Sequence, residues 1–283
     1  MQTRVLRQAP AVRAVEHRCS AGPADRPFEE EHLVTSISLV LAGAFRYRCA
    51  AGTVALGPGT ALLGNRGDRY VCSHELGQGD HCLAFFLDDA ALDGIASHLS
   101  LRGAPRFRAA AAPPTHALAG PWAVAVAAAT GDAAAISVEE AAYELAAAVL
   151  TAEADRRPSP GAITARDQRR AADAMRWLDE RADEPIALAD TAAAVGLGPF
   201  HFLRVFHRTV GVTPHQYLVA ARLRRAAAAL VGSDRPITAI AYDSGFGDLS
   251  NFIRTFRRAT GASPRVFRAR GAQRVGGAGS RIT

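Results

Sequence analysis

Two cysteines and a histidine lie close together in the first half of the chain, at a spacing that suits metal binding. The segment runs Cys72-Ser-His74-Glu-Leu-Gly77-Gln-Gly79-Asp-His81-Cys82. Alternation along a strand places Cys72 and His74 on one face. If Gly77-Gln78-Gly79 is a three-residue hairpin loop, His74 faces Cys82 and Cys72 lies diagonal to it. Thiolate and imidazole groups bind a soft metal such as zinc, and the set would be completed by Cys19, His32 or His81.

Two other interpretations of the cysteines remain open. A four-residue loop would turn Cys82 to the opposite face and abolish the metal site. Cys72 and Cys82 would then be small buried hydrophobic residues, a common role of free cysteine. A thiol that senses oxidation is the third alternative. The sequence therefore establishes no cofactor, and zinc held by Cys72, His74 and Cys82 is its one candidate.

Arginine recognition of DNA bases is a second possible chemistry, and it depends on a repeat in the C-terminal half. Residues 188–197 match residues 237–246 at an offset of 49, and residues 202–214 match residues 252–264 at an offset of 50. In each copy a small residue is followed four positions later by Gly, which supplies a positive φ at the end of a helix. A Phe pair spaced i, i+4 then gives a second helix its inward face. Two helices joined in this way form a helix-turn-helix, whose second helix enters the major groove.

Two further helices are expected around the repeat. One covers Arg166–Arg181 and precedes the first unit. The other begins between the units, where Thr213 is an N-cap and Pro214 the first helical residue. Its apolar stripe, which ends at Leu230, predicts a helix that holds the units one turn of DNA apart, about 34 Å.

This arrangement resembles the DNA-binding domain of the AraC/XylS family of bacterial transcription regulators. The second copy, from Ile240 to Pro264, is similar to the family signature through its whole length. One departure is Thr191, where the second copy has the larger Ile240. The resemblance implies double-stranded DNA and RNA polymerase as partners. It also implies a homodimer and an N-terminal domain, often a cupin-like barrel, that senses an unknown small-molecule or metal effector.

The outward faces of the two recognition helices carry the candidate DNA contacts. They are Phe200, His201, Leu203, Arg204 and Arg208 in the first helix and Leu249, Ser250, Ile253, Arg254 and Arg257 in the second. The resemblance assigns base reading to all of them except His201, Arg208 and Arg257. Arg204 and Arg254 are the strongest candidates because Arg binds guanine O6 and N7 in bidentate fashion. Leu203 and Ile253 would contact thymine methyl groups. The alternative for either Arg is a phosphate contact or a surface salt bridge.

Short apolar runs between Arg26 and Phe86 predict strands that form a small barrel or a sandwich. The expected strands cover residues 34–41, 45–49, 53–56, 61–63, 70–74 and 82–87. From Asp89 to Asp155 the pattern becomes helical and rich in Ala, most clearly at Val138–Ala154. An apolar stripe on this helix serves either the internal core or a subunit interface, and consists of Ala142, Leu145, Ala146 and Val149.

These observations predict an α+β protein in four parts. Residues 1–155 form a sensing and dimerisation domain, a small β-barrel of cupin type with Ala-rich helices, and residues 156–162 are a linker. Residues 163–270 form an all-α domain with two helix-turn-helix units, and residues 271–283 are a disordered tail. The chain has no His-x-His pair of the kind enzymatic cupins use and no other catalytic pattern, so we predict that it is not an enzyme. The alternative is a metal-dependent cupin-type enzyme with a basic helical appendage that binds nucleic acid.

Charge is distributed unevenly along the chain. Residues 1–162 contain 14 Arg and 17 acidic residues, whereas residues 163–270 contain 17 Arg and 10 acidic residues. A basic half beside a mildly acidic half is typical of a protein that contacts phosphate, although a basic surface kept for solubility is the alternative. No run is long enough to span a bilayer and no signal peptide is recognised, so we expect a cytoplasmic protein with reduced cysteines and no membrane partner.

Overall fold

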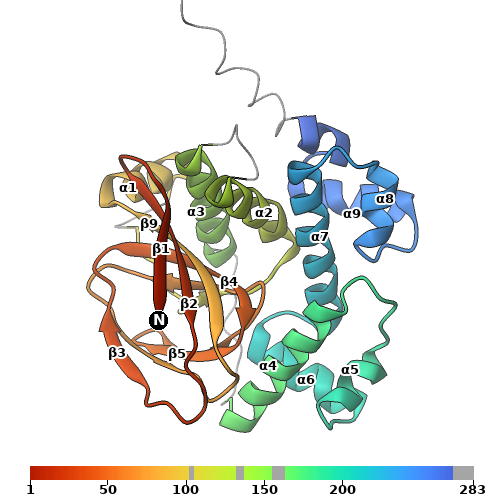
Figure 1. Ribbon diagram of the computed structural model, residues 1–283, viewed down its shortest axis with the longest axis horizontal. Helices are drawn as coiled ribbons and strands as arrows, with labels where there is room; N and C mark the ends of the chain where they lie inside the picture. Colours follow the sequence, from red (N-terminus) through yellow and green to blue (C-terminus); the bar gives the residue numbers. More distant parts are fainter. Residues whose placement is uncertain (102–104, 132–136, 155–162, 270–283) are drawn as a thin grey trace, which may run out of the picture.

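A computed structural model of the chain describes residues 1–101, 105–131, 137–154 and 163–269. The predicted linker at 156–162 and the predicted tail at 271–283 lie outside the described residues. In the described part, ten strands and the helices α1 to α3 come before residue 155, and the helices α4 to α9 and a short helical stretch at 264–269 follow it (Figure 1). The predicted α+β fold class is therefore confirmed. None of the described helices combines the length and the apolar character needed to cross a membrane.

The strands form two antiparallel sheets that face each other. Six strands pair in the order β1-β2-β9-β4-β7-β10, and four pair in the order β3-β8-β5-β6. The strands are β1 (Gln2–Gln8), β2 (Val12–Cys19), β3 (Phe28–Glu31), β4 (Thr35–Gly43), β5 (Phe45–Cys49), β6 (Gly52–Leu56), β7 (Ala61–Gly64), β8 (Arg69–Ser73), β9 (Asp80–Leu87) and β10 (Ala111–Ala112). Neither order closes on itself, so the described strands form an open sandwich rather than a closed barrel.

Four strands, β1, β2, β3 and β10, were not predicted from the sequence, and the surroundings of β1 and β3 explain why those two were missed. Strand β1 is an edge strand whose side chains are almost all exposed, so it needs no apolar alternation. Strand β3 reads Phe-Glu-Glu-Glu and pairs with β8 at the edge of the smaller sheet. Polar edge strands resist pairing with other chains, and they carry little of the signal by which strands are recognised.

The inner strands of the six-stranded sheet are buried on both faces. Along β9, Leu83, Phe85 and Leu87 belong to the core that this sheet shares with the helices, whereas Cys82 belongs to the core between the two sheets. The period of two along a strand explains this division, because alternate side chains point to opposite faces. The N-terminal half is therefore built in three layers, with helices, the larger sheet and the smaller sheet in that order.

Three helices cover the larger sheet: α1 (Asp89–His98), α2 (His116–Thr130) and α3 (Val138–Ala154). On α3, Ala142, Leu145, Ala146 and Val149 are at most 1% exposed and belong to the core of a single chain. The core interpretation of this stripe is therefore correct, and the stripe is not available as a subunit interface. Helix α2 is apolar almost all round because it packs against α3 on one side and against the C-terminal half on another.

In the described residues of the C-terminal half, six main helices precede a short helical stretch at 264–269. The helices are α4 (Ala165–Glu180), α5 (Leu188–Ala194), α6 (Pro199–Val210), α7 (Pro214–Gly232), α8 (Ile237–Asp243) and α9 (Leu249–Thr260). Helices α5 and α6 form one unit, α8 and α9 the other, and α7 runs between them (Figure 1). As predicted, Thr213 caps α7: its Oγ1 accepts a hydrogen bond of 3.2 Å from the Gln216 amide.

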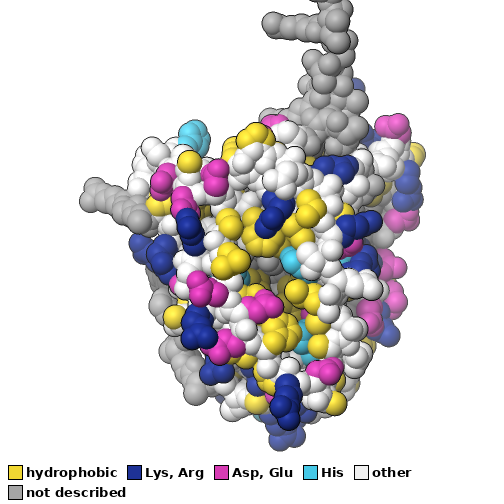
Figure 2. Space-filling view, turned by 60° about the vertical axis from the view of Figure 1, so that its left-hand side comes forward, with side chains coloured by type: hydrophobic (Ala, Val, Ile, Leu, Met, Phe, Trp, Pro, Cys, Tyr) yellow, Lys and Arg dark blue, Asp and Glu magenta, His cyan; other side chains and the backbone are white. Residues whose placement is uncertain are grey.

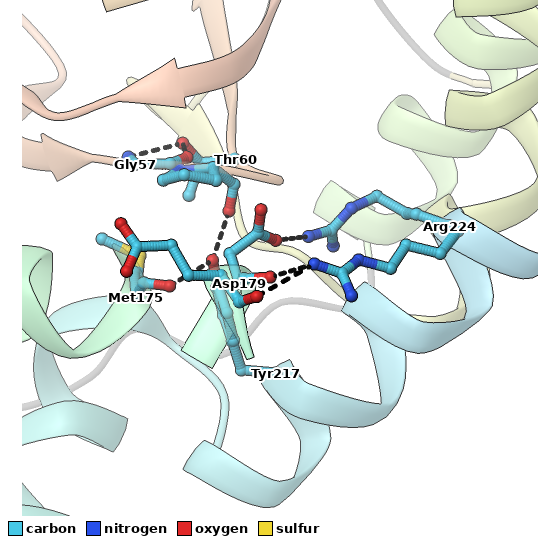
Figure 3. A network of polar contacts seen from close by, with 9 residues as sticks. Gly57, Thr60, Met175, Asp179, Tyr217 and Arg224 are labelled. Atoms are coloured by element: carbon cyan, nitrogen blue, oxygen red, sulfur yellow. Dashed lines mark hydrogen bonds and ion pairs between the residues drawn. The ribbon is translucent and has the colours of Figure 1, made fainter. Parts of the chain in front are cut away.

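A turn of the sandwich and two helices of the C-terminal half meet in a polar network (Figure 3). The hydroxyl of Tyr217 on α7 donates to the carbonyl oxygen of Pro58 at 2.6 Å and lies 3.2 Å from the carbonyl oxygen of Met175 on α4. Burial raises the pKa of Tyr217 above its usual range, so the phenol stays protonated and remains a donor. The guanidinium of Arg224, also on α7, pairs with Asp179 at 3.0 Å and lies over the ring of Trp122 on α2. The two halves are therefore held together by directional contacts as well as by apolar packing.

Candidate nucleic-acid interface

Each repeat unit folds around the residues that the sequence singled out. Gly196 and Gly245 have φ values of 65° and 89°, the left-handed conformation that was predicted for the turns. The small residues four positions before these glycines, Ala192 and Ala241, are fully buried. The inward-facing aromatic residues are at most 1% exposed, and these are Phe202, Phe206, Phe252 and Phe256. With the aromatic side chains of α6 and α9 turned inward, the opposite face of each helix is left for solvent or a ligand.

The outward face of α6 is exposed and partly apolar. Phe200 is 91% exposed at the start of the helix, and Leu203 is 37% exposed. His201 and Arg204 are exposed beside them. Two exposed apolar side chains beside an exposed arginine form a surface suited to contact with another molecule.

The outward face of α9 is more basic. Ser250, Ile253, Arg254 and Arg257 are exposed, and they line a shallow surface depression together with Arg258. One guanidinium nitrogen of Arg254 donates to Asn251 Oδ1 at 3.2 Å, one helical turn away. Sequence reasoning did not single out Asn251 or Arg258. The i, i+3 spacing of Asn251 and Arg254 is the feature of the sequence that would have pointed to Asn251.

Two of the proposed DNA contacts, Arg208 and Leu249, are half-buried rather than fully exposed in the structure. Arg208 is half-buried and forms an ion pair of 2.8 Å with Asp167 on α4. Leu249 is half-buried and packs against the core of the second unit. Both residues lie on the recognition helices as expected, but neither is on the fully exposed face.

Much of the positive charge counted in this half serves internal contacts. Three arginines of α7 bind groups of the segment from Asp179 to Glu184: Arg222 binds the carbonyl oxygens of Ala182 and Glu184, and Arg224 and Arg225 pair with Asp179 and Asp183. By contrast, Arg204 and Arg257 have no ion-pair partner among the described residues. The cations without an ion-pair partner among the described residues of this half thus include four on the recognition helices, together with Arg166, Arg169 and Arg170 on α4 and Arg265 beyond α9.

The predicted hairpin of Cys72, His74 and Cys82 is wrong. Strand β8 pairs with β3 and β5, whereas β9 pairs with β2 and β4, so the two strands belong to different sheets. All three residues instead line a cavity of about 300 Å³ between the sheets. The side chain of His74 stacks between Phe28 and Phe45 and forms a hydrogen bond of 2.7 Å with Asp80. His32 and His81, considered as further ligands, are hydrogen-bonded to Tyr47 and Glu16 respectively.

Burial keeps several titratable groups around this cavity in their neutral forms, although Arg13, Glu30 and Glu31 also line it. Burial raises the pKa of the Cys72 and Cys82 thiols above the ordinary range, which disfavours a reactive thiolate at either position. Burial also lowers the pKa of His17 and His32, so these rings stay unprotonated near neutral pH. Figure 2 shows one face of the molecule, on which hydrophobic side chains and histidines lie among charged groups. The cavity is mostly apolar with a few polar groups, as small-molecule sites commonly are.

Two exposed recognition faces, each carried by a helix that follows a glycine turn, define a protein of the double helix-turn-helix class. A family model described as a helix-turn-helix domain matches residues 191–270. The chain is 38% identical over 98 residues to the regulatory protein ada of Salmonella typhimurium, a match that covers 35% of this chain and 27% of the relative. It is 39% identical over 98 residues to the transcriptional activator RhaS of Salmonella schwarzengrund, with 33% and 34% of the two chains covered.

A solved structure of a transcriptional regulator with an AraC-type DNA-binding domain, from Chromobacterium violaceum, is 29% identical. It covers 39% of this chain and 98% of its own, with a TM-score of 0.36. The chain spans only about a quarter to a third of the length of the two curated relatives. Residues 191–270 therefore form a helix-turn-helix domain similar to those of proteins named as regulators, and the resemblance found in the sequence is confirmed.

Proposed function

We propose that the protein is a transcription regulator that binds double-stranded DNA in the cytoplasm through both helix-turn-helix units. The observation that carries this proposal is the pair of outward faces on α6 and α9, where exposed apolar side chains lie beside arginines that have no ion-pair partner among the described residues. Arginine at these positions suits guanine, and Leu203 and Ile253 suit thymine methyl groups. The relatives that match this half are named as regulators, which supports the same conclusion.

The N-terminal half would supply the regulation by binding an effector in the cavity between the sheets. Leu62 of β7 lines the cavity, and β7 follows directly on the turn from Gly57 to Thr60. That turn meets Tyr217 and Arg224 on α7, the helix that runs between the two DNA-binding units. A ligand that displaces β7 therefore has a short physical route to the helix that sets the separation of the two units.

A binding-site selection with the full chain tests this function. We expect a steep preference for a site with two contacted segments about one turn of DNA apart, and footprinting near the protein's own gene should find it. Uniform affinity for all sequences would contradict a regulator. Candidate small molecules and metals that change the footprint would identify the effector.

Further parts of the proposal concern partners and catalysis. We infer that the regulator acts as a homodimer and contacts RNA polymerase, and light scattering and a pull-down with the polymerase test these two points. We also infer that it is not an enzyme, since the relatives it matches are named as regulators. Turnover by the metal-loaded protein, with none by the metal-free form, would favour the metal-dependent enzyme instead.

A further inference from the structure

Three metal-binding side chains that are far apart in the sequence meet at one end of the cavity between the sheets. One donor atom from each of Cys19, His74 and Asp80 lies within 4.8 Å of the others. Cys19 is the last residue of β2 and Asp80 the first of β9, and the two are direct partners in the antiparallel ladder. His74 follows β8 in the opposite sheet, so both sheets contribute to the cluster.

The existing contacts hold these donors in place. Nε2 of His74 lies 2.7 Å from Asp80 Oδ2, and the side chains of both residues are at least nine-tenths buried. The His74 ring stacks between Phe28 and Phe45, with ring centroids 6.0 Å and 5.7 Å away. The other carboxylate oxygen, Asp80 Oδ1, accepts a hydrogen bond of 3.2 Å from the Cys82 thiol. A buried carboxylate that is already oriented by a histidine and a thiol is close to the arrangement that a metal ion requires.

The chemistry of the donors matches a borderline-soft divalent cation. One sulfur, one nitrogen and one oxygen donor form a set typical of zinc. Tetrahedral bonds of about 2.0–2.3 Å place such donors about 3.3–3.6 Å apart. The widest separation in the cluster, at most 4.8 Å, therefore needs to contract by at most about 1.5 Å, and the contact of 2.7 Å between His74 and Asp80 needs to open by about 0.6 Å. A thiolate from Cys19 and the carboxylate of Asp80 together balance two positive charges, which avoids a net charge in a buried site.

We propose that Cys19, His74 and Asp80 bind a zinc-type divalent metal ion whose fourth coordination position opens toward the cavity. The ion joins the end of the β2–β9 ladder to the loop that follows β8, and it thereby ties the two sheets together. Cys19 is half-buried and also lines a shallow depression on the surface, which provides an access route from solvent. The ligand set differs from the one expected from sequence, since Cys72 and Cys82 line the same cavity without belonging to the cluster.

Zinc uptake by the full chain, produced without an affinity tag and stripped with a chelator, tests the site. We expect one Zn²⁺ per chain, and an affinity that falls at least about tenfold in Cys19→Ser and in Asp80→Asn when measured against a competing chelator. Cys49→Ser is the matched control, because this half-buried cysteine ends β5 outside the cluster and its loss should leave zinc binding unchanged. Thermal melts of the metal-free variants establish that each is folded, and Asp80→Asn serves if Cys19→Ser does not fold.

Cobalt substitution reports the ligands directly. A thiolate-to-cobalt charge-transfer band is expected for the wild-type protein and for Cys49→Ser, and it should be absent from Cys19→Ser. Sub-stoichiometric zinc, or wild-type affinity in both cluster variants, would overturn the proposal. A cobalt band that is lost in Cys49→Ser but kept in Cys19→Ser would do the same. Metal uptake is measured without DNA, so its outcome is independent of the proposed regulator function.

Discussion

Arg204 and Arg208 lie one helical turn apart on the first recognition helix, yet the structure gives them different surroundings. Arg204 is exposed and has no ion-pair partner in the described part of the chain, whereas Arg208 is half-buried against Asp167. A buried ion pair loses stability when one partner is removed, because the remaining charge is left uncompensated. Position on a recognition helix therefore does not by itself make an arginine a DNA contact.

Arg254 is expected to read a base, because it is exposed on α9 and oriented by Asn251. Arg254→Ala should weaken binding to the preferred site by about 1–3 kcal/mol and relax the preference at one guanine. Titrations against a panel of single-base variants of the site would measure both effects. Arg265→Ala, an exposed arginine beyond α9, is the control and should leave base preference unchanged. An equal loss on every sequence would make Arg254 a phosphate contact.

We predict that protonation of His32 makes the folding stability of the protein depend on pH. Burial lowers its pKa, an effect that nearby Asp68 and Glu30 only partly oppose, and its ring is hydrogen-bonded to Tyr47 at 2.8 Å. The unfolded chain therefore takes up a proton below about pH 6.5 while the folded chain does not, so stability is lost as the pH falls through this range.

One such proton changes the free energy of unfolding by at most about 1.4 kcal/mol per pH unit. Urea unfolding between about pH 7 and pH 5.5 measures the slope, which His32→Gln should reduce. The same slope in both proteins would show that His32 is not responsible.

Helices α2 and α3 show how a whole element acquires its role from its neighbours. Both are rich in Ala, but α2 contacts the helices of both halves whereas α3 contacts the larger sheet, α1 and α2. Alanine side chains are small, so neighbouring elements can pack closely against these helices on several sides at once. The spacing of the apolar stripe on α3 is compatible with either an internal core or a subunit interface. Only the elements that surround α3 in the structure show that the stripe belongs to the core.

Leu145→Ala should therefore destabilise the monomer rather than change its oligomeric state. Leu145 is 1% exposed in the main core, and truncation of such a residue costs about 2–5 kcal/mol through lost burial and the cavity left behind. Thr151→Ala on the exposed side of the same helix is the control and should change stability by less than about 0.5 kcal/mol. Chemical denaturation and light scattering of both variants provide the comparison. A fully stable Leu145→Ala protein with altered mass would contradict the core assignment.

At the scale of the whole molecule, the turn from Gly57 to Thr60 is a polar link between the sandwich and the C-terminal half. Gly59 has a φ of 85°, and a Cβ atom built on it would lie 2.4 Å from the guanidinium carbon of Arg224. Arg224 in turn contacts Asp179, Trp122 and Tyr217, so displacement of its guanidinium disturbs α2, α4 and α7 together.

Gly59→Ala is expected to loosen this link. Gly67 provides a matched control, because its φ of 82° imposes the same backbone strain while no atom lies within 4 Å of the Cβ position. Both variants should lose about 1–3 kcal/mol from strain, but Gly59→Ala should lose at least about 1 kcal/mol more. Hydrogen exchange should then be faster in α7 for Gly59→Ala alone. Equal behaviour of the two variants would indicate that Arg224 adapts without disturbing the contact.

The DNA-binding half was predictable from sequence because its structure depends on short spacings. A glycine turn, a small residue four positions before it and an aromatic pair one helical turn apart all act within one unit, and the repeat shows each of them twice. The structure bears out three predictions that rest on such local spacings. They are the cap at Thr213, the positive φ at Gly196 and Gly245, and the inward orientation of the aromatic side chains. The α+β class and most strands of the sandwich followed from alternation in the same way.

Contacts between distant segments were decided only by the tertiary structure. The sequence suggested that Cys72 and Cys82 belong to one hairpin, but β8 and β9 pair with strands of different sheets, so the cluster forms instead from Cys19, His74 and Asp80. Likewise, the charge of Arg208 and of the arginines on α7 is visible in the sequence, whereas their partners on α4 and the loop after it are not. Periodicity reports which face of an element is buried, but it carries no information about which other element covers that face.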